Sequence, residues 1–194
     1  MTNPLRAPWD TPFELPPFNL IEDTHFAPAV EAALADARAA IAAICDGSVP
    51  TFENTIEALS LADAPLEKAL SPFFAVAGAD SNDTREALMR DFSPMLSAYS
   101  SEITSNADLF GRIDDLWARR DTLGLNDEQA RVLMLVRRNF VRSGALLKGE
   151  EAARLAEVKQ RLSVLGTQFT QNLLADERSW YMALDDLSGL PDFV

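Results

Sequence analysis

The sequence predicts an all-α protein, an antiparallel array of about six helices with an extended, proline-rich N-terminal arm and one short strand near the C-terminus. Three observations predict this fold. Apolar residues recur at spacings of three and four along most of the chain, which is the period of a helix. These stretches are about twenty residues long, and short connections containing Gly, Pro or Asn separate them. Of the 194 residues, 47% are hydrophobic and 24% charged, as in globular proteins.

The N-terminal arm, residues 1–22, contains five prolines interleaved with large apolar residues. Proline fixes φ and removes a backbone donor, so we expect this segment to be extended rather than helical. A disordered tail is the alternative. The apolar residues favour an arm that lies in a groove on the helical body. They are Trp9, Phe13, Phe18, Leu20 and Ile21.

The first helix is expected from Asp23, where the helical period begins. Asp23 or Thr24 can cap it, or Pro28 can occupy its first turn, where the missing N–H costs nothing. Gly47 and Pro50 end it. Its apolar stripe consists of Phe26, Val30, Leu34, Ala37, Ile41 and Ile44.

The second helix is expected to start after Thr51, a good N-cap residue followed by the acidic Glu53. Pro65 and Pro72 each remove a backbone hydrogen bond, at a cost of about 3 kcal/mol in an unbroken helix, so we expect two segments or a kinked helix. Residues 78–82 form the next loop. The stripe is Phe52, Ile56, Leu59, Leu66, Leu70 and either Phe73 or Phe74.

Four further helices follow from the same spacing. The third tolerates or bends at Pro94, and Asn106 caps the fourth, which Gly124 closes. The fifth opens at residues 126–128, with Leu147 as a candidate extension of its stripe, and the sixth follows Gly149. Their stripes are Leu88, Phe92, Leu96, Tyr99 and Ile103; Leu109, Ile113, Leu116 and Trp117; Leu133, Val136 and Phe140; and Leu155, Val158, Leu162, Leu165, Phe169 and Leu173.

The last residues break the helical pattern. Bulky apolar residues alternate between Ser179 and Leu184, as in a strand, and such a strand needs a partner, for which the arm is one candidate. Ser188, Pro191 and Asp192 then resemble the opening of another helix, so we expect the chain to be a piece of a longer polypeptide. We therefore divide it into an arm (1–22), a helical domain (23–178) and a final part with the strand and the start of the next element (179–194).

The charge excludes several functional classes. With 30 acidic and 17 basic residues, the formal net charge is −13, which disfavours nucleic acid and membrane surfaces as partners. No apolar run approaches the length of a membrane span, and the start lacks the apolar region of a signal peptide. The sequence therefore predicts a cytoplasmic protein, and its single cysteine agrees with a reducing compartment.

Titratable residues give no catalytic, cofactor-binding or metal-binding site. His25 is the only histidine and Cys45 the only cysteine, so a His/Cys zinc site is excluded and every nucleophilic arrangement needs His25. We interpret His25 as structural, at a helix start. Asp46 beside Cys45 argues against a reactive thiol. No glycine-rich phosphate loop is present.

Two polar groups have a structural and a functional interpretation. One group is six arginines, which either pair with carboxylates of neighbouring helices or of an adjoining domain, or bind a substrate carboxylate. The other, near Gly166, is either a buried polar network or a peptide-contacting surface. Gly166 itself indicates close contact with another helix. The groups are Arg119, Arg120, Arg131, Arg137, Arg138 and Arg142; and Gln168, Gln171 and Asn172.

Several segments, taken in order, resemble the thimet-oligopeptidase-like zinc metallopeptidases. Within that family they are most similar to the N-terminal part of the bacterial peptidyl-dipeptidases, with the oligopeptidases A as near relatives. The segments are NPL at 3–5, PWDTPF at 8–13, TFENTI at 51–56, FF at 73–74, AGADSN at 77–82, LGTQF at 165–169 and NLLADE at 172–177.

The resemblance implies the first quarter to third of a cytosolic, nearly all-helical peptidase with two lobes around a channel. In that family a zinc ion held by an H-E-x-x-H helix and a further glutamate hydrolyses short peptides. This sequence contains no H-E-x-x-H, so the chain alone is expected to be inactive, with the zinc in a C-terminal catalytic lobe that is its partner. The implied role is a wall of the channel. The alternatives are a free-standing helical interaction module and a degenerate homologue kept as a regulator.

Overall fold

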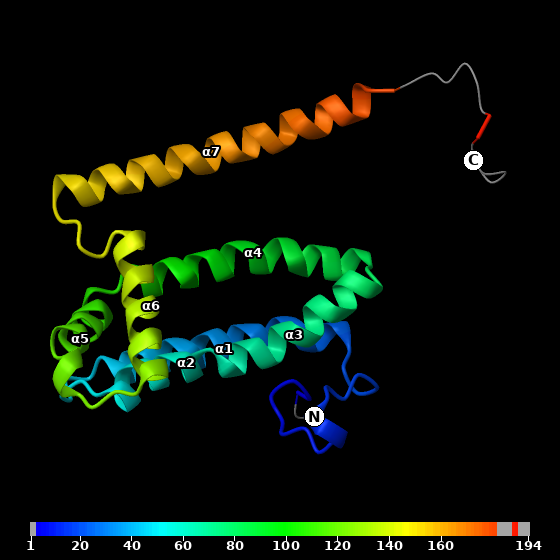
Figure 1. Ribbon diagram of the computed structural model, residues 1–194. Helices are drawn as coiled ribbons and strands as arrows, with labels where there is room; N and C mark the ends of the chain where they lie inside the picture. The colour runs from blue at the N-terminus through cyan, green and yellow to red at the C-terminus, as the bar shows by residue number, and fades with distance from the viewer. Residues whose placement is uncertain (1–2, 182–187, 190–194) are drawn as a thin grey trace. The chain divides into compact units, whose positions relative to one another are not determined.

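The structure, a computed structural model, describes residues 3–181 and 188–189, without the side chain of Thr167. It divides into two compact units, Met1–Leu146 and Leu147–Val194. Unit 1 holds the arm and helices α1 to α6, and unit 2 holds α7 (Figure 1). In the part of the chain that the structure describes, no helix is long and apolar enough to span a bilayer.

Helix α1 spans Asp23–Ile44 and follows the predicted stripe. Its N-cap is Glu22, so the expected caps Asp23 and Thr24 are wrong, and Pro28 lies inside the helix rather than in its first turn. The backbone N–H of Glu22 donates to Nδ1 of His25 at 2.9 Å. This reciprocal cap uses a histidine where Glu or Gln is usual, and the pattern of cap residues therefore missed it.

The second predicted helix is divided as expected at its first proline. It consists of a π-helical turn η2 (Phe52–Glu57), α2 (Ala58–Ala62) and α3 (Ala64–Ala79). Thr51 caps η2, since its Oγ1 accepts from the N–H of Asn54 at 3.1 Å. Pro65 lies in the first turn of α3, where a proline is tolerated. Pro72 is buried inside α3 without ending it, and α3 continues to Ala79, into the predicted loop.

Helices α4 (Asp83–Thr104), α5 (Ala107–Ala118) and α6 (Asp127–Ser143) follow. Each begins after an asparagine whose Oδ1 accepts a backbone N–H three residues on, at 2.8 to 2.9 Å. Pro94 lies inside α4. A 3-10 turn, η3 (Arg120–Thr122), precedes the turn at Gly124. α6 ends at Gly144, which has φ 102°, so Leu147 does not extend it. The capping asparagines are Asn82, Asn106 and Asn126.

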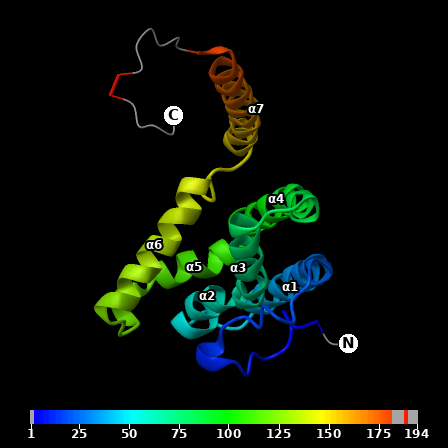
Figure 2. The ribbon, with the colours of Figure 1, turned by 90° about the vertical axis from the view of Figure 1, so that its right-hand side faces the viewer.

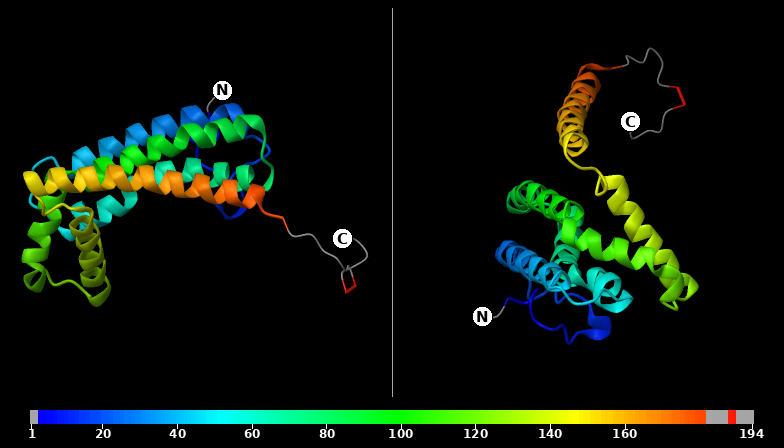
Figure 3. Two further views of the ribbon diagram at one scale, coloured as in Figure 1. Left: turned by 90° about the horizontal axis from the view of Figure 1, so that it is seen from above. Right: turned by 90° about the vertical axis from the view of Figure 1, so that its left-hand side faces the viewer.

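The first core lies between α1, α3 and α4, which run alongside one another with α3 antiparallel to the other two (Figures 1 and 3). Phe73 is at its centre, with ring centroids 5.1 Å from Phe26 and 4.9 Å from Phe92 in edge-to-face geometry. Such pairs contribute about 0.5–1.5 kcal/mol beyond burial. Phe73 is fully buried and the neighbouring Phe74 is 48% exposed, which settles the choice that the sequence left open.

The second core lies where α1 ends, between that end, η2, α5 and α6 (Figure 2). Its largest aromatic contact stacks Phe110 on Phe140 at 6.1 Å. α1 contributes to both cores and thereby connects them. The other fully buried large side chains of this core are Ile56, Leu109, Ile113, Leu116 and Leu133.

The arm docks on the helices of unit 1 through its first residues, and Ile21 near its end also packs against the first core. Leu5 is buried in the first core, Trp9 packs against that core, and Nδ2 of Asn3 donates to the carbonyl of His25 at 2.8 Å. The groove expected for the arm therefore exists for this part. The arm is not extended throughout, because it includes a 3-10 turn, η1 (Pro12–Glu14), in which Phe13 is 96% exposed.

Unit 2 consists of α7 (Glu150–Ser179) and the residues after it. The predicted strand is not found in its described part: Ser179 is helical, and neither Trp180 nor Tyr181 is in a strand. Its remainder, residues 182–184, lies outside the described residues. Ser188 and Gly189 form a turn, while the rest of the expected helix start, residues 190–194, also lies outside them.

Candidate functional site

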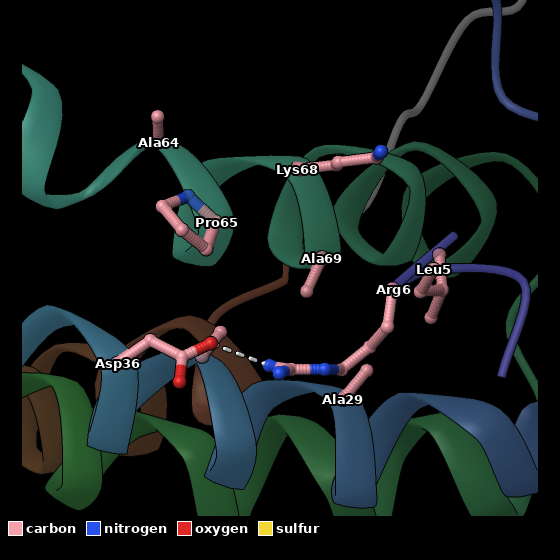
Figure 4. A pocket seen from close by; sticks show the side chains of 9 residues that line it. Leu5, Arg6, Ala29, Asp36, Ala64, Pro65, Lys68 and Ala69 are labelled. Atoms are coloured by element: carbon pink, nitrogen blue, oxygen red, sulfur yellow. Dashed lines mark hydrogen bonds and ion pairs between the residues drawn. The ribbon is translucent and has the colours of Figure 1, made fainter. Parts of the chain in front are cut away.

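A hollow of about 370 Å³ lies between the arm, α1 and α3 (Figure 4). Its size falls within the usual range of ligand pockets. Small residues form most of its surface, and the charged side chains around it are Arg6, Asp36 and Lys68. The small residues are Ala29, Ala33, Ala64, Pro65 and Ala69.

The charged groups of this hollow hold the arm in place. Arg6 points along α1 to Asp36, with 2.8 Å between Nη1 and Oδ2 (Figure 4). Nζ of Lys68 donates to the carbonyl of Ala7 at 2.7 Å and lies 4.6 Å from the ring centroid of Trp9. The contact of Arg6 joins residues 30 positions apart, and those of Lys68 join residues about sixty positions apart, so no local pattern in the sequence predicts them. We assign the hollow to arm anchoring.

The predicted arginine cluster separates into paired and unpaired members. Nε of Arg137 lies 2.7 Å from Oδ1 of Asp114, and Arg119 forms an ion pair with Asp115. Arg120 has Oδ2 of Asp121 at 3.6 Å. The expected pairing with a neighbouring helix is correct for Arg137 on α6, whereas Arg119 and Arg120 pair with carboxylates close to them in sequence. For the other three no carboxylate of the described residues lies within 4.0 Å, and pairing with an adjoining domain stays a prediction: Arg131, Arg138 and Arg142.

A buried arginine that the sequence did not single out joins α5 to η2. Arg112 is 8% exposed, and its guanidinium donates to the carbonyl of Ser48 at 2.6 Å, to Oδ1 of Asn54 at 3.0 Å and to Oγ1 of Thr55 at 3.2 Å. Its Nε is buried without an acceptor. All these acceptors are neutral, so the cation stabilises backbone and side-chain dipoles rather than a carboxylate. The arrangement fixes the loop before η2.

His25 and Cys45 have structural environments. The imidazole caps α1 as described, in agreement with the structural interpretation, and the thiol follows the last residue of α1. Burial, and then the negative charges of Asp108 and Asp46, raise the pKa of Cys45 above its ordinary value, although Arg112 opposes them. A raised pKa leaves little thiolate at neutral pH. Cys45 is therefore a poor nucleophile.

The residues present do not fit a metal centre. Among the residues that the structure describes, no group of three or more His, Cys, Asp or Glu side chains is placed to hold a metal ion. Zinc binding in proteins uses three or four such ligands. No step of a reaction is therefore derived through a metal held by this chain.

The polar group on α7 is exposed and forms no buried network within unit 2. Gln168, Gln171 and Asn172 are all exposed. A Cβ placed on Gly166 meets no atom within 4 Å, so unit 2 does not supply the close helix contact that this glycine indicates.

Comparison with known proteins identifies relatives along nearly the whole chain. It is 38% identical over 193 residues to the dipeptidyl carboxypeptidase of Salmonella typhimurium and 34% identical over 189 residues to that of Escherichia coli. It is also 34% identical over 197 residues to the oligopeptidase A of Salmonella typhimurium. No family model matches the chain.

The extent of these matches decides how they are interpreted. They cover 97%, 97% and 99% of this chain but 28% of each relative. The chain thus spans little more than a quarter of the length of these relatives. The matches confirm the resemblance that the short segments indicate. The chain therefore belongs to the family of the dipeptidyl carboxypeptidases and oligopeptidases A, and it corresponds to an N-terminal portion of these larger proteins.

Proposed function

We propose that this chain is the non-catalytic, N-terminal helical part of a zinc oligopeptidase, a peptidyl-dipeptidase that releases C-terminal dipeptides from short peptides. The observation that carries the proposal is the match to two dipeptidyl carboxypeptidases, which covers 97% of this chain and 28% of each relative. The proposed reaction is the one that the names of these relatives describe. The zinc ion, on this proposal, belongs to the catalytic lobe of the same polypeptide, and that lobe is the partner of this chain.

The role proposed for the helices is to form part of the lobe that walls the substrate channel. Two features support a rigid wall. Both cores of unit 1 are built from buried side chains, and Arg112 donates hydrogen bonds to the loop between α1 and η2. A stiff wall limits the size of the peptides that enter the channel, because closely packed cores resist deformation. A cytoplasmic location and the exclusion of nucleic acid and membranes as partners stay predictions from composition.

The first test is the intact mass of the native gene product in its source cell. If 21.3 kDa is 28% of the whole, the product has a mass of about 76 kDa, well beyond a typical single domain. A product of that size supports the proposal. A product of 21.3 kDa contradicts it and favours the free-standing interaction or regulatory module.

A second test concerns catalysis. The purified 194-residue chain with added zinc should hydrolyse no short peptide, while the full-length product should do so and lose its activity to a chelator. Chelator-sensitive cleavage by the 194-residue chain would show that it carries a metal centre of its own.

A further inference from the structure

A second pocket, of about 420 Å³, lies in unit 1 between the end of α5, η3 and the first half of α6. It shares no residue with the hollow under the arm. Trp117, Leu125 and Met134 give it apolar walls, and Trp117 and Leu125 are also packed against the second core. The walls are therefore held by the fold, as in a preformed site.

Two guanidinium groups line the same pocket. Arg120 is held in place, because its Nη1 donates to the carbonyl of Trp117 at 2.9 Å and its guanidinium lies 4.5 Å from the Trp117 ring centroid. On the other side, Arg131 has no carboxylate within 4.0 Å among the described residues. One carboxylate, Asp121, also lines the pocket, but it is 83% exposed, so solvent screens it. The lining therefore carries a net charge of +1 within a chain of net charge −13.

The third nearby arginine is already neutralised. Arg137 lies 5.3 Å from the Trp117 ring centroid and forms its ion pair with Asp114. Arg131 is thus the cation of the pocket without a carboxylate among the described residues, and Arg120 has the exposed Asp121 at 3.6 Å. A planar guanidinium fits a carboxylate in a bidentate arrangement. A polyanion is a poor ligand because the negative charge of the whole chain repels it.

We propose that this pocket binds a carboxylate carried next to an apolar side chain, as at the C-terminus of a short peptide. That the carboxylate belongs to a peptide rests on the proposed function. That the pocket recognises a carboxylate does not rest on it. In this arrangement Arg120 and Arg131 contact the carboxylate, and the side chain lies against Trp117, Leu125 and Met134. The site holds peptides on the surface formed by α5 and α6.

The test is a calorimetric titration of the 194-residue chain with acetyl-Ala-Ala-Leu, bearing a free carboxylate, and with its C-terminal amide. We expect the acid to bind about two- to fivefold more tightly than the amide, the range that a partly exposed ion pair gives. Arg131→Gln should remove this preference. Added salt should weaken binding of the acid, since exposed charges are screened.

Two variants serve as matched controls. Arg138→Gln removes an unpaired arginine from the same helix outside the pocket, and Arg90→Gln removes an exposed arginine from α4. Both change the net charge as Arg131→Gln does, and both should leave the preference for the acid unchanged. Far-UV circular dichroism checks that each variant is folded. If Arg131→Gln does not fold, Arg131→Lys keeps the charge without the bidentate geometry and should weaken binding of the acid in the same direction.

The outcomes distinguish the two possible sources of the carboxylate. They also distinguish a failure of the proposed pocket from a failure of the proposed peptidase function. Binding of acetyl-Asp-Leu-amide as tight as that of the acid supports carboxylate recognition and assigns the source to an acidic side chain. Equal binding of acid and amide, an unchanged preference in Arg131→Gln, or no binding up to about 10 mM peptide overturns the proposal. A gene product of 21.3 kDa whose pocket binds the acid refutes only the proposed peptidase. A full-length gene product whose pocket does not bind the acid refutes only the proposed carboxylate site.

Discussion

Single residues of this chain contribute more to its stability than their chemical type indicates, and Arg112 is the clearest case. It is a charged residue that is 8% exposed, and it donates to oxygens of Ser48, Asn54 and Thr55. A buried charge is expensive unless its hydrogen bonds are made. These bonds join α5 to the loop and to η2, where Oδ1 of Asn54 also accepts from the N–H of Thr51 at 2.8 Å and from Oγ1 of Thr55 at 2.9 Å.

Replacement of this arginine tests its contribution to stability. Arg112→Met should lower the free energy of unfolding by about 2–3 kcal/mol, because the loss of several buried bonds outweighs the relief of burying a charge. Urea denaturation measures the change. Arg90→Met, at an exposed site on α4, should cost no more than about 0.5 kcal/mol. Equal effects of the two variants would show that Arg112 has no special role.

Asp23 is the residue whose protonation should matter most at the junction of α1 and α4. A hydrogen bond from Asn82, followed by the contact with Arg85 at 2.7 Å, lowers the pKa of Asp23 below its ordinary 3.8, although burial opposes the shift. A carboxyl whose pKa is lowered on folding stabilises the protein above its unfolded pKa. This contribution disappears as the pH falls through the folded value.

Asp23→Asn should therefore destabilise the chain at neutral pH by about 0.5–1 kcal/mol. The difference from the wild type should shrink as the pH falls below 3.8, the ordinary pKa of this carboxyl. Thermal unfolding followed over pH measures it. Asp91→Asn, at an exposed aspartate of α4, is the control for the loss of one carboxylate. A constant difference at all pH values would show that the charge of Asp23 is not involved.

Among the elements, α3 shows how packing selects between neighbouring residues. Phe73 and Phe74 are adjacent on one helix, yet Phe73 is fully buried between Phe26 and Phe92 and Phe74 is 48% exposed. Removal of a buried phenyl group leaves a cavity that a packed core cannot fill. The two positions should therefore respond very differently to the same substitution.

Phe73→Ala should destabilise unit 1 by about 3–5 kcal/mol, and Phe74→Ala by less than about 1 kcal/mol. Because both variants remove the same group from the same helix, helix propensity cancels between them. Chemical denaturation of both measures the difference. The Phe74 ring has an edge-to-face contact with Phe73 at 5.3 Å, and similar losses would show that this contact matters as much as burial between Phe26 and Phe92.

At the scale of the whole molecule, all the buried hydrophobic residues of the two cores lie between Leu5 and Phe140. Unit 1 therefore contains a complete set of packed elements. We expect residues 1–146 to unfold cooperatively on their own, with a midpoint within about 5 °C of that of the 194-residue chain. Scanning calorimetry measures both. Residues 1–118, which lack α6 and with it Leu133 and Phe140, are the control and should lose the transition.

The sequence alone determined the fold class, most helix starts and the family. Caps at Thr51, Asn106 and Asn126 are local, since each cap side chain bonds a backbone N–H three residues away, and a local pattern reveals them. The helical stripes are equally local, because they follow from a period of 3.6 residues. Where the pattern was unusual, as in the Glu22–His25 cap, the expected cap residue of α1 was wrong, although the helix begins at Asp23 as expected.

Tertiary structure decided which side chains the helices bury and which they leave to solvent. The burial of Phe73 and of Arg112, the place of the arm over Lys68, and the difference between paired Arg137 and unpaired Arg131 all depend on residues more than twenty positions away in sequence. The same holds for Pro72, which α3 accommodates without ending. Contacts between helices are set by how whole elements pack, and a single stripe of apolar residues does not encode that geometry.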